Sequence, residues 1–391
     1  MNGILENQKS QEYVQNVNHR IGIERNMLSH KFRIYPSKAT QQALNEHLEL
    51  CRWLYNRLLE ELSRAREENR KITQRDTQAL IVKLKEENPK LKQVYSKVLQ
   101  MINYQLWSNI KALSNLKKNG KKVGKLRFKG EGWFKTMNFN QSGFKIEGKK
   151  LILSKIGAMP IKLHRVMNSK IKSVIIKREA SGKWYAIFQV EDIPNPLPKT
   201  GRSIGIDVGI KHFLTDSEGR KIENPRFYEK TLERITITQH WLSRKKKGSK
   251  NREKQRIKLA KLYEKLVNQR NDFLHKLSRF YVNNYSIIVV ENLNIRGIVR
   301  NHNLDGKLID ASWRKFLQML LYKAERADRV VVKVNPRGTS KEYKFGKLDR
   351  DYNASLNILM RGWDGPKTPV DIGPLRVIPA SLVVEAGSLL R

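Results

Sequence analysis

Three short segments in the second half of the sequence each place a carboxylate beside apolar residues. Asp207 interrupts the apolar stretch IGIDVGI, Glu291 ends the apolar run IIVVE, and Asp349 and Asp351 lie in the sequence DRDYNA. Carboxylate oxygens are the ligands that Mg²⁺ and Mn²⁺ prefer in proteins. Two such ions about 3.5–4 Å apart can hold both the attacking and the leaving oxygen of a phosphoryl displacement. We therefore expect a metal-dependent nuclease centre.

Each of these acids also has a purely structural interpretation. Asp207 could close a turn, Glu291 could cap a helix, and Asp349 or Asp351 could be an N-cap residue. Their order favours the metal site, because an acid on a first strand, an acid ending a later buried strand and an acid opening a helix converge at the carboxyl edge of a sheet. A bound metal ion lowers the pKa of water, so no His, Ser or Cys nucleophile is needed.

The charge balance of the chain indicates a polyanionic partner. The 391 residues include 78 Lys and Arg against 37 Asp and Glu, which gives a formal charge of +41. Nucleic acid is favoured over a membrane surface as the partner. No apolar run approaches the roughly 18 residues of a membrane-spanning helix, so we expect no membrane association. The length suffices for two or three domains.

Cysteine and histidine usage excludes two further kinds of site. Cys51 is the single cysteine, so a disulfide within the chain and a cysteine-based zinc site are both impossible, and a cytoplasmic protein is expected. The eight histidines form no HExxH pair, which argues against a zinc hydrolase. Cys51 lies on an apolar helical face with Leu44, Leu48 and Tyr55, so we predict that it is buried in the core.

The first half of the chain combines helices with short strands. The polar residues 1–27 predict a disordered extension, residues 30–35 a strand, and the spacing from Leu44 to Leu62 a long helix, with further helices over 74–87 and 94–117. Runs of β-branched and aromatic residues then predict an antiparallel β-barrel or sandwich that includes strand 30–35, into which the helical residues are inserted. The predicted strands of this part are Leu126–Lys129, Thr136–Asn140, Phe144–Ile146, Lys150–Leu153, Ile171–Arg178 and Trp184–Val190.

Residues 193–198 contain three prolines and indicate a stiff boundary before an α/β pattern. A strand hairpin over 203–215, with an acid on its first strand, is how RNase-H-like folds begin, and buried strands are predicted over 286–290 and 329–334. Helices are predicted over 309–327 and 351–360.

Residues 226–282 predict a long helical hairpin with a strongly one-sided charge. Between Trp241 and Phe280 lie 14 Lys or Arg residues and three acids. A solvated helix face normally mixes both signs, so this run favours contact with a phosphate backbone. In the first half of the chain, Tyr104 and Trp107 could stack on bases, although core packing is the better interpretation of both. The candidate nucleic-acid contacts are Arg244, Lys245, Lys246, Lys247, Lys250, Arg252, Lys254, Tyr104 and Trp107.

The acidic motifs closely resemble the split RuvC motifs of TnpB proteins, which are encoded by insertion sequences and related to type V CRISPR effectors. The resemblance extends to Lys31–Tyr35, Asp310–Trp313 and Val332–Ser340, and covers residues 28–391. It implies an RNA-guided DNA endonuclease that holds a guide RNA from the transposon end and cuts double-stranded target DNA beside a short adjacent motif. A monomer is favoured. The implied catalytic residues and ligands of Mg²⁺ or Mn²⁺ are Asp207, Glu291 and Asp351, with Asp349 as a second candidate for the third ligand.

The family also implies a multidomain architecture, in which a β-barrel wedge domain with an inserted helical recognition domain precedes an RNase-H-like (RuvC) α/β nuclease domain. The expected divisions are an extension over 1–27, a wedge domain over 28–37 and 120–196, a recognition domain over 38–119, a nuclease domain over 203–362 and a C-terminal tail over 363–391.

The sequence departs from the family before its third acid. Most members carry a four-cysteine zinc ribbon after Thr-Ser-Lys, whereas here residues 336–348 form a degenerate loop without cysteine, so no zinc is expected. The loss of this ribbon keeps a second hypothesis open, in which the chain is an RNA-guided repressor with weak or no cleavage. A third hypothesis is a conventional DNA transposase, against which the acid spacings and the resemblance both argue. Because all the acids are retained, an active nuclease is the favoured interpretation.

Overall fold

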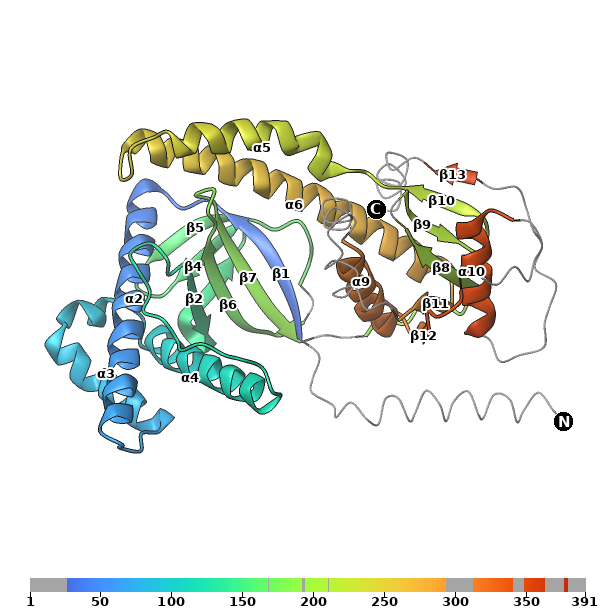
Figure 1. Ribbon diagram of the computed structural model, residues 1–391. Coiled ribbons are helices and arrows are strands. Elements are labelled where there is room, and N and C mark those ends of the chain that lie inside the picture. The colour runs from blue at the N-terminus through green and yellow to red at the C-terminus, as the bar shows by residue number, and fades with distance from the viewer. Residues whose placement is uncertain are drawn as a thin grey trace. The chain divides into compact units, whose positions relative to one another are not determined.

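The computed structural model describes residues 27–167, 169–191, 194–209, 211–292, 312–339, 348–362 and 376–378, apart from the side chains of 141 and 376–378. The chain divides into two compact units, Met1–Asp192 and Ile193–Arg391. Both units combine helices with a β-sheet (Figure 1).

The first unit is built on a curved, near-barrel sheet of antiparallel strands in the order β2-β6-β7-β1-β5-β4-β3. As the sequence predicted, β1 joins this sheet, where it lies between β7 and β5. The short strand β5 was not predicted, since its sequence GAMPIK contains a glycine and a proline. The strands are β1 (Met27–Ile34), β2 (Thr136–Asn140), β3 (Phe144–Glu147), β4 (Lys150–Leu153), β5 (Gly157–Lys162), β6 (Ile171–Arg178) and β7 (Trp184–Glu191).

The predicted helices of this unit are confirmed, and side-chain caps define where two of them begin. Ser37 Oγ accepts a hydrogen bond from the backbone N–H of Thr40 at the start of α2, and Thr73 and Asp76 form a reciprocal capping box at the start of α3. The helical segments are α2 (Lys38–Glu67), α3 (Gln74–Glu87), η1 (Pro89–Gln93), α4 (Ser96–Lys118) and the 3₁₀ turn η2 (Gln141–Gly143).

The apolar face of α2 packs into the core of the first unit. Leu44, Leu48, Cys51 and Tyr55 are buried there with the sheet residue Phe188. Burial of Cys51 is confirmed, and it raises the pKa of the Cys51 thiol to about 12. The thiol therefore stays protonated and serves as a packing group.

The strand predicted over Leu126–Lys129 is wrong, because this segment is irregular in the structure. The backbone of Lys129 pairs with side chains of α2 in place of a neighbouring strand. Its N–H donates to Asn56 Oδ1 (2.8 Å), while its carbonyl accepts from Asn56 Nδ2 (3.0 Å) and from Arg52 (3.1 Å). These side chains satisfy the backbone groups that a strand ladder would otherwise satisfy.

The second unit contains a mixed sheet in the order β12-β11-β8-β9-β10-β13. Strand β11 is parallel to both β8 and β12, whereas β8, β9 and β10 are antiparallel neighbours. The predicted strands over 203–215, 286–290 and 329–334 are confirmed. The strands are β8 (Ser203–Val208), β9 (His212–Asp216), β10 (Arg220–Glu223), β11 (Ile287–Glu291), β12 (Val330–Val334) and β13 (Arg376–Ile378).

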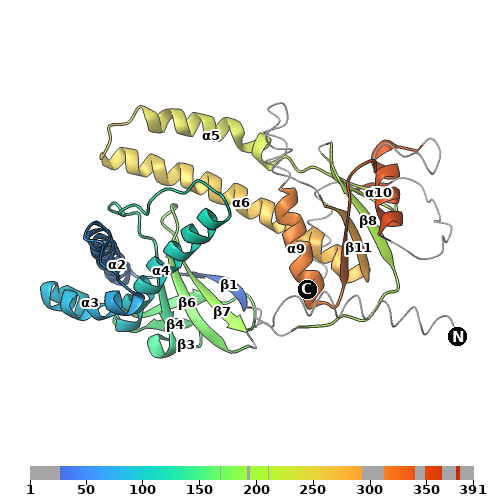
Figure 2. The ribbon, with the colours of Figure 1, turned by 60° about the horizontal axis from the view of Figure 1, so that its bottom comes forward.

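The long helical hairpin predicted from the sequence is confirmed as two antiparallel helices, α5 and α6 (Figure 2). The far end of α6 packs against α9 and the sheet through Phe273, Leu277 and Tyr281. Helix α10 lies beside β8. The helices of this unit are α5 (Phe227–Ser243), α6 (Lys250–Asn284), α9 (Trp313–Arg326) and α10 (Arg350–Arg361).

A buried polar cluster attaches the β9–β10 turn to α6. Asp216 is fully buried and accepts hydrogen bonds from Arg220 Nε (2.7 Å) and Tyr281 Oη (2.9 Å). Arg220 also donates to Tyr285 Oη. Arg220 and Tyr281 counter part of the cost of burying this carboxylate, although burial still raises the pKa of Asp216, and their hydrogen bonds hold the β9–β10 turn against the end of α6.

Several predictions fall outside the described residues. These are the extension before Met27, the start of the helix predicted from residue 309, most of the loop over 336–348 and most of the tail over 363–391. Within the part of the chain that the structure describes, no helix is both long and apolar enough to cross a membrane.

Candidate active site

Asp207 and Glu291 lie on neighbouring parallel strands at the same level of the second sheet. Val290 of β11 pairs with Ile206 of β8, so Glu291 and Asp207 are the next residues along the two strands. Neighbouring strands are about 4.8 Å apart, and residues in register on parallel strands point to the same face. The backbone therefore places both carboxylates on one face, as the order of the motifs predicted.

Helix α10 approaches this face of the sheet at a glycine. A Cβ atom built on Gly205 would lie 2.2 Å from the carbonyl oxygen of Ser355 and 2.8 Å from Leu359 Cβ. Asp207 is two residues after Gly205 on β8, and Asp351 is one helical turn before Ser355 on α10. The distance from Gly205 to Asp207 along the strand and the distance from Ser355 to Asp351 along the helix are both about 6–7 Å. The close approach therefore brings Asp351 alongside Asp207.

The electrostatics of Asp207 show the same grouping. Burial and the negative charges of Glu291 and Asp351 raise the pKa of Asp207 to about 8, against the opposing charge of Arg350. Burial also raises the pKa of Glu291, although the hydrogen bond from Thr339 and the charge of Arg361 oppose that shift. The structure thus brings Glu291 and Asp351 close enough to Asp207 for their charges to act on its carboxylate.

Thr339 holds Glu291 in place, and sequence reasoning assigned it no role. Its buried hydroxyl donates to Glu291 Oε1, and its backbone carbonyl accepts from Asn357 Nδ2 of α10 (2.8 Å). Thr339 therefore connects the end of β11 to the helix that carries Asp351. Its only signal in the sequence was its place in the Val332–Ser340 segment of the resemblance.

Asp349 and Asp351 have different surroundings. Asp349 is the N-cap of α10, where its Oδ1 accepts from the backbone N–H of Tyr352 (3.2 Å), and its Oδ2 lies 3.0 Å from Lys221 Nζ. Burial opposes the shift, but the interaction with Lys221 lowers the pKa of Asp349. Asp351 instead lies in the first turn of α10 and interacts with Asp207.

The chemistry of this group suits a hard divalent cation, because three carboxylates supply oxygen donors only. Burial and, after it, the negative charges of Glu291 and Asp351 raise the pKa of Asp207 despite the opposing charge of Arg350, so this position favours a proton or a bound cation. Among the described residues, no three His, Cys, Asp or Glu side chains are close enough together to hold a metal ion as they stand. The donor set fits the ion, although the side chains are not gathered into a finished cage.

The cationic residues predicted as nucleic-acid contacts cluster where α5 ends and α6 begins. Ser249 caps α6 through a hydrogen bond from the backbone N–H of Arg252 (3.1 Å), which fixes the turn between the helices. The exposed members are Arg244, Lys246, Lys247, Lys250 and Lys254, and the half-buried ones are Lys245 and Arg252. Together they place a cationic surface at the tip of the hairpin.

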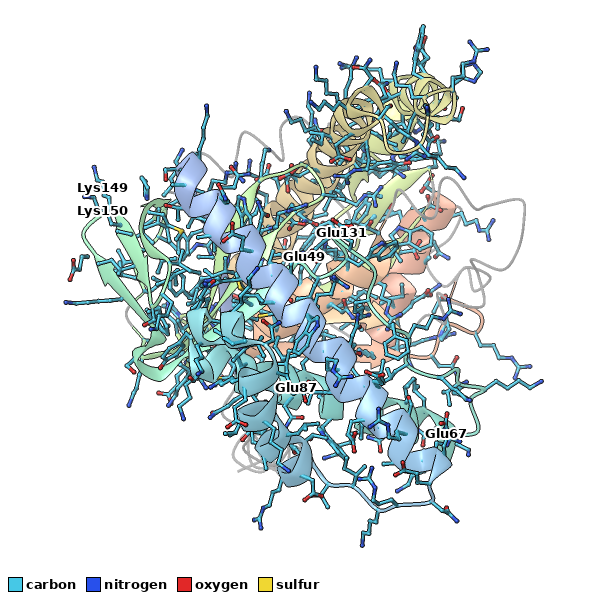
Figure 3. All side chains as sticks on the ribbon, turned by 90° about the vertical axis from the view of Figure 1, so that its left-hand side faces the viewer. Glu49, Glu67, Glu87, Glu131, Lys149 and Lys150 are labelled. Carbon is cyan, nitrogen blue, oxygen red and sulfur yellow. The ribbon has the colours of Figure 1, made fainter. Side chains whose placement is uncertain are left out.

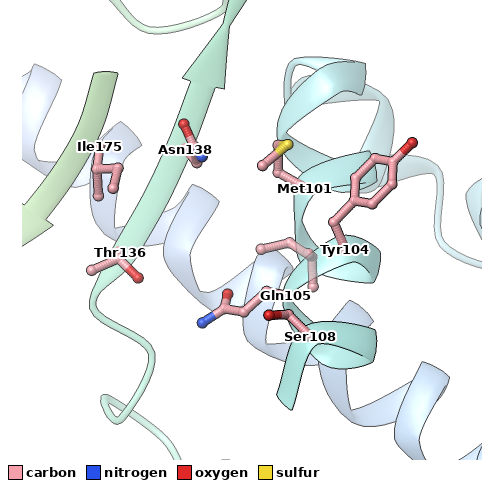
Figure 4. A pocket seen from close by; sticks show the side chains of 8 residues that line it. Met101, Tyr104, Gln105, Ser108, Thr136, Asn138 and Ile175 are labelled. Carbon is pink, nitrogen blue, oxygen red and sulfur yellow. The ribbon is translucent and has the colours of Figure 1, made fainter. Parts of the chain in front are cut away.

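Tyr104 and Trp107 lie on α4 in the first unit. The Tyr104 side chain is 53% exposed, whereas Trp107 is half-buried and donates from Nε1 to Thr77 Oγ1 (2.8 Å). Tyr104 borders a pocket of about 360 Å³ between α4 and β2 (Figure 4). The pocket is also lined by Gln105 and by Asn138, whose buried Oδ1 has no hydrogen-bond partner among the described residues.

Three protein-family models match parts of this sequence. OrfB_IS605, described as a probable transposase, matches residues 186–302, and a Cas12f1-like TNB domain matches residues 313–358. HTH_OrfB_IS605, described as a helix-turn-helix domain, matches residues 27–71, which here form β1 and the long helix α2.

Similar proteins are found in bacteria and in a giant virus. "Putative RNA-guided DNA endonuclease" from Streptomyces pristinaespiralis is 31% identical over 362 residues, which cover 85% of this chain and 88% of that protein. "Putative RNA-guided DNA endonuclease InsQ" from Escherichia coli strain K12 is 26% identical, over 81% of this chain and 82% of that protein. "TnpB-like protein L79" from Acanthamoeba polyphaga mimivirus is 27% identical over 49% of this chain and 43% of that protein.

Among solved structures, the cryo-EM structure of the Cas12f1-sgRNA-target DNA complex aligns with 82% of this chain and 83% of that chain. The TM-score is 0.48 and the sequence identity is 13%.

Proposed function

This chain belongs to the TnpB family, and we propose that it is an RNA-guided DNA endonuclease. Asp207, Glu291 and Asp351 form the active site at which it hydrolyses phosphodiester bonds of DNA. Its partners in this proposal are a guide RNA from the end of an insertion sequence and a double-stranded target DNA with a short adjacent motif. The guide selects the target by base pairing, so the protein has to bind the backbones of both nucleic acids. The charge of +41 suits that task.

One observation carries the catalytic part of the proposal. Burial first, and then the carboxylates of Glu291 and Asp351, raise the pKa of Asp207, although the three acids come from β8, β11 and α10. A fold normally separates like charges or pairs them with cations, because uncompensated buried charge is destabilising. Groups whose environments shift their pKa in this way are typical of functional sites.

We assign Asp207, Glu291 and Asp351 as ligands of Mg²⁺ or Mn²⁺. Such an ion, when bound, supplies an activated water and neutralises charge that develops on the phosphate. Thr339 orients Glu291 through its hydroxyl, and the contact at Gly205 sets the position of Asp351. Asp349 is better assigned as the cap of α10 than as a ligand, since its carboxylate already interacts with Tyr352 and Lys221.

The cationic tip of the α5–α6 hairpin is proposed to contact a nucleic-acid backbone. Its exposed members, four lysines and Arg244, form a predominantly positive surface. A phosphate chain can bind such a surface with release of counterions, so binding should weaken steeply as salt rises.

The proposal is tested by purifying the full chain from cells that also carry the DNA flanking its reading frame. The copurifying RNA is sequenced, and a guide of that design is matched to a supercoiled plasmid whose target adjoins a randomised segment. We expect Mg²⁺-dependent linearisation, and none with EDTA or a scrambled guide. A plasmid that is bound but stays supercoiled would identify a guided repressor, and strand-transfer products would identify a transposase. Absence of both binding and cleavage would refute the proposal.

A further inference from the structure

A surface loop of the first unit, residues 121–135, displays two large aromatic side chains. The Phe128 side chain is 59% exposed and that of Trp133 is 76% exposed. Single exposed apolar residues are common on protein surfaces and need no explanation. Here, however, two exposed rings lie five residues apart in one loop. The segment between them is held to helix α2 at two points.

The attachment points adjoin the two rings. Lys129, next to Phe128, makes two reciprocal backbone hydrogen bonds with the side-chain amide of Asn56. The backbone N–H of Gly132, next to Trp133, donates to Glu49 Oε1 (3.1 Å). Between these points, the Trp133 N–H donates to the carbonyl of Gly130 (3.2 Å), which closes a turn. The backbone that carries both rings is therefore fixed before any partner binds.

One face of α2 supplies these contacts. Glu49, Arg52 and Asn56 are spaced three and four residues apart, so they lie on the same side of the helix. Arg52 donates to the carbonyl of Lys129 (3.1 Å) and pairs with Glu49 Oε2 (2.6 Å), which connects the two attachment points. Glu49 on α2 and Glu131 at the tip of the loop are labelled in Figure 3.

The loop is also strongly cationic. Lys121, Lys122, Lys125 and Arg127 are exposed, whereas Glu131 is its one acidic residue. Aromatic rings with neighbouring cations suit unpaired nucleotides, because the rings stack on bases while the cations contact phosphates. Holding the rings in place beforehand reduces the entropy lost on binding. A purely hydrophobic partner would not require the cations, and a phosphate backbone alone would not require the rings.

We propose that residues 121–135 form a stacking platform for unpaired nucleotides of RNA, with Phe128 and Trp133 as the stacking groups. The inference rests on the proposed function, which supplies the RNA. Bases of duplex DNA are already stacked and paired, whereas unpaired segments of a guide expose their bases before any target is opened. RNA is therefore the partner that the platform meets first.

The first test measures binding of the full chain to a fluorescein-labelled single-stranded RNA of about 20 nucleotides, which spans one or more typical sites. We expect the pair Phe128→Leu and Trp133→Leu, which keeps apolar bulk without a ring face, to weaken binding about 10-fold or more. The matched pair Phe128→Tyr and Trp133→Phe should bind like the native chain. The slope of log affinity against log salt should stay the same for both pairs, since no phosphate contact is removed.

The second test crosslinks the purified RNA-loaded chain with ultraviolet light before target DNA is added. A peptide containing residues 128–133 should carry RNA, and its yield should fall in Asn56→Leu, which releases the loop while leaving both rings present. A crosslink that forms only to DNA, and only after target is added, would overturn the choice of RNA. Native affinity of the leucine pair would refute the platform while leaving the proposed function intact. Failure of the native chain to bind RNA would refute both.

Discussion

The contact between β8 and α10 makes Gly205 a sensitive position for activity. Alanine at this position would place its Cβ 2.2 Å from the backbone oxygen of Ser355. Neither partner can yield by rotating a side chain, because one is a strand backbone and the other is a helix backbone. Reaching an ordinary contact of 3.4 Å requires α10 to move outward by about 1.2 Å.

That displacement would carry Asp351 away from Asp207. A misplacement of about 1 Å at a reacting centre costs on the order of 10²-fold in rate. Overpacking of this kind also destabilises a protein by about 1–3 kcal/mol. We therefore predict that Gly205→Ala folds with reduced stability and cleaves target DNA about 100-fold more slowly, with RNA binding unchanged.

The assay is single-turnover cleavage of the matched plasmid by the RNA-loaded variant, accompanied by urea unfolding. The control is Asp272→Ala, which changes an exposed side chain that pairs with Lys276 on α6 and takes no part in the contact between β8 and α10. Retained RNA binding shows that the variant is folded. Native cleavage by Gly205→Ala would refute the inference that the position of α10 sets the geometry of the site.

Three further predictions concern single side chains. Thr339→Val removes the hydroxyl that donates to Glu291 and should slow cleavage about 10-fold or more. Thr339→Ser keeps a hydroxyl and should cleave at the native rate. Equal cleavage rates for the two variants would show that the Thr339 hydroxyl does not support the site. Asp349→Ala removes the cap of α10, so it should lower the free energy of unfolding by about 1 kcal/mol and retain cleavage. Asp351→Ala should abolish cleavage. The reverse pattern would identify Asp349 as the metal ligand. Lys323 is buried, and burial lowers its pKa to about 7. Between that pH and about 10 only the unfolded chain keeps this proton. The free energy of unfolding of the native chain should therefore rise by up to about 1.4 kcal/mol per pH unit relative to that of Lys323→Met. If urea unfolding gave the same difference between the two proteins at pH 7 and at pH 9.5, this prediction would be wrong.

Local periodicity was sufficient to predict most of the elements that carry the site. The buried run before Glu291 became β11, and the apolar spacing after Asp351 became α10. Strand β10 was not predicted, because it has four residues and a single buried side chain, Ile222. The strand predicted at Leu126–Lys129 failed because the partner of its backbone is Asn56, 73 residues away, and no local pattern shows such a partner.

The candidate site also depends on contacts between distant residues, which local sequence patterns do not show. The sequence supplied the acids but could not rank Asp349 against Asp351, since the ranking depends on a contact with Lys221. It also missed Gly205, although a glycine within a buried strand is a known sign of close backbone approach. Thr339 could not be assigned a role, because its contact with Glu291 joins segments that are distant in the sequence.

The most direct test of the central claim is guided cleavage by Asp207→Ala, which removes the carboxylate that Glu291 and Asp351 influence. The matched control is Asp272→Ala, which removes an exposed acid that pairs with Lys276 on α6. Both RNA-loaded proteins are given the matched supercoiled plasmid in Mg²⁺, and linear product is measured alongside target binding. We predict that Asp207→Ala binds the target and leaves it supercoiled, while Asp272→Ala linearises it at the native rate. Native cleavage by Asp207→Ala would contradict the assignment of the active site.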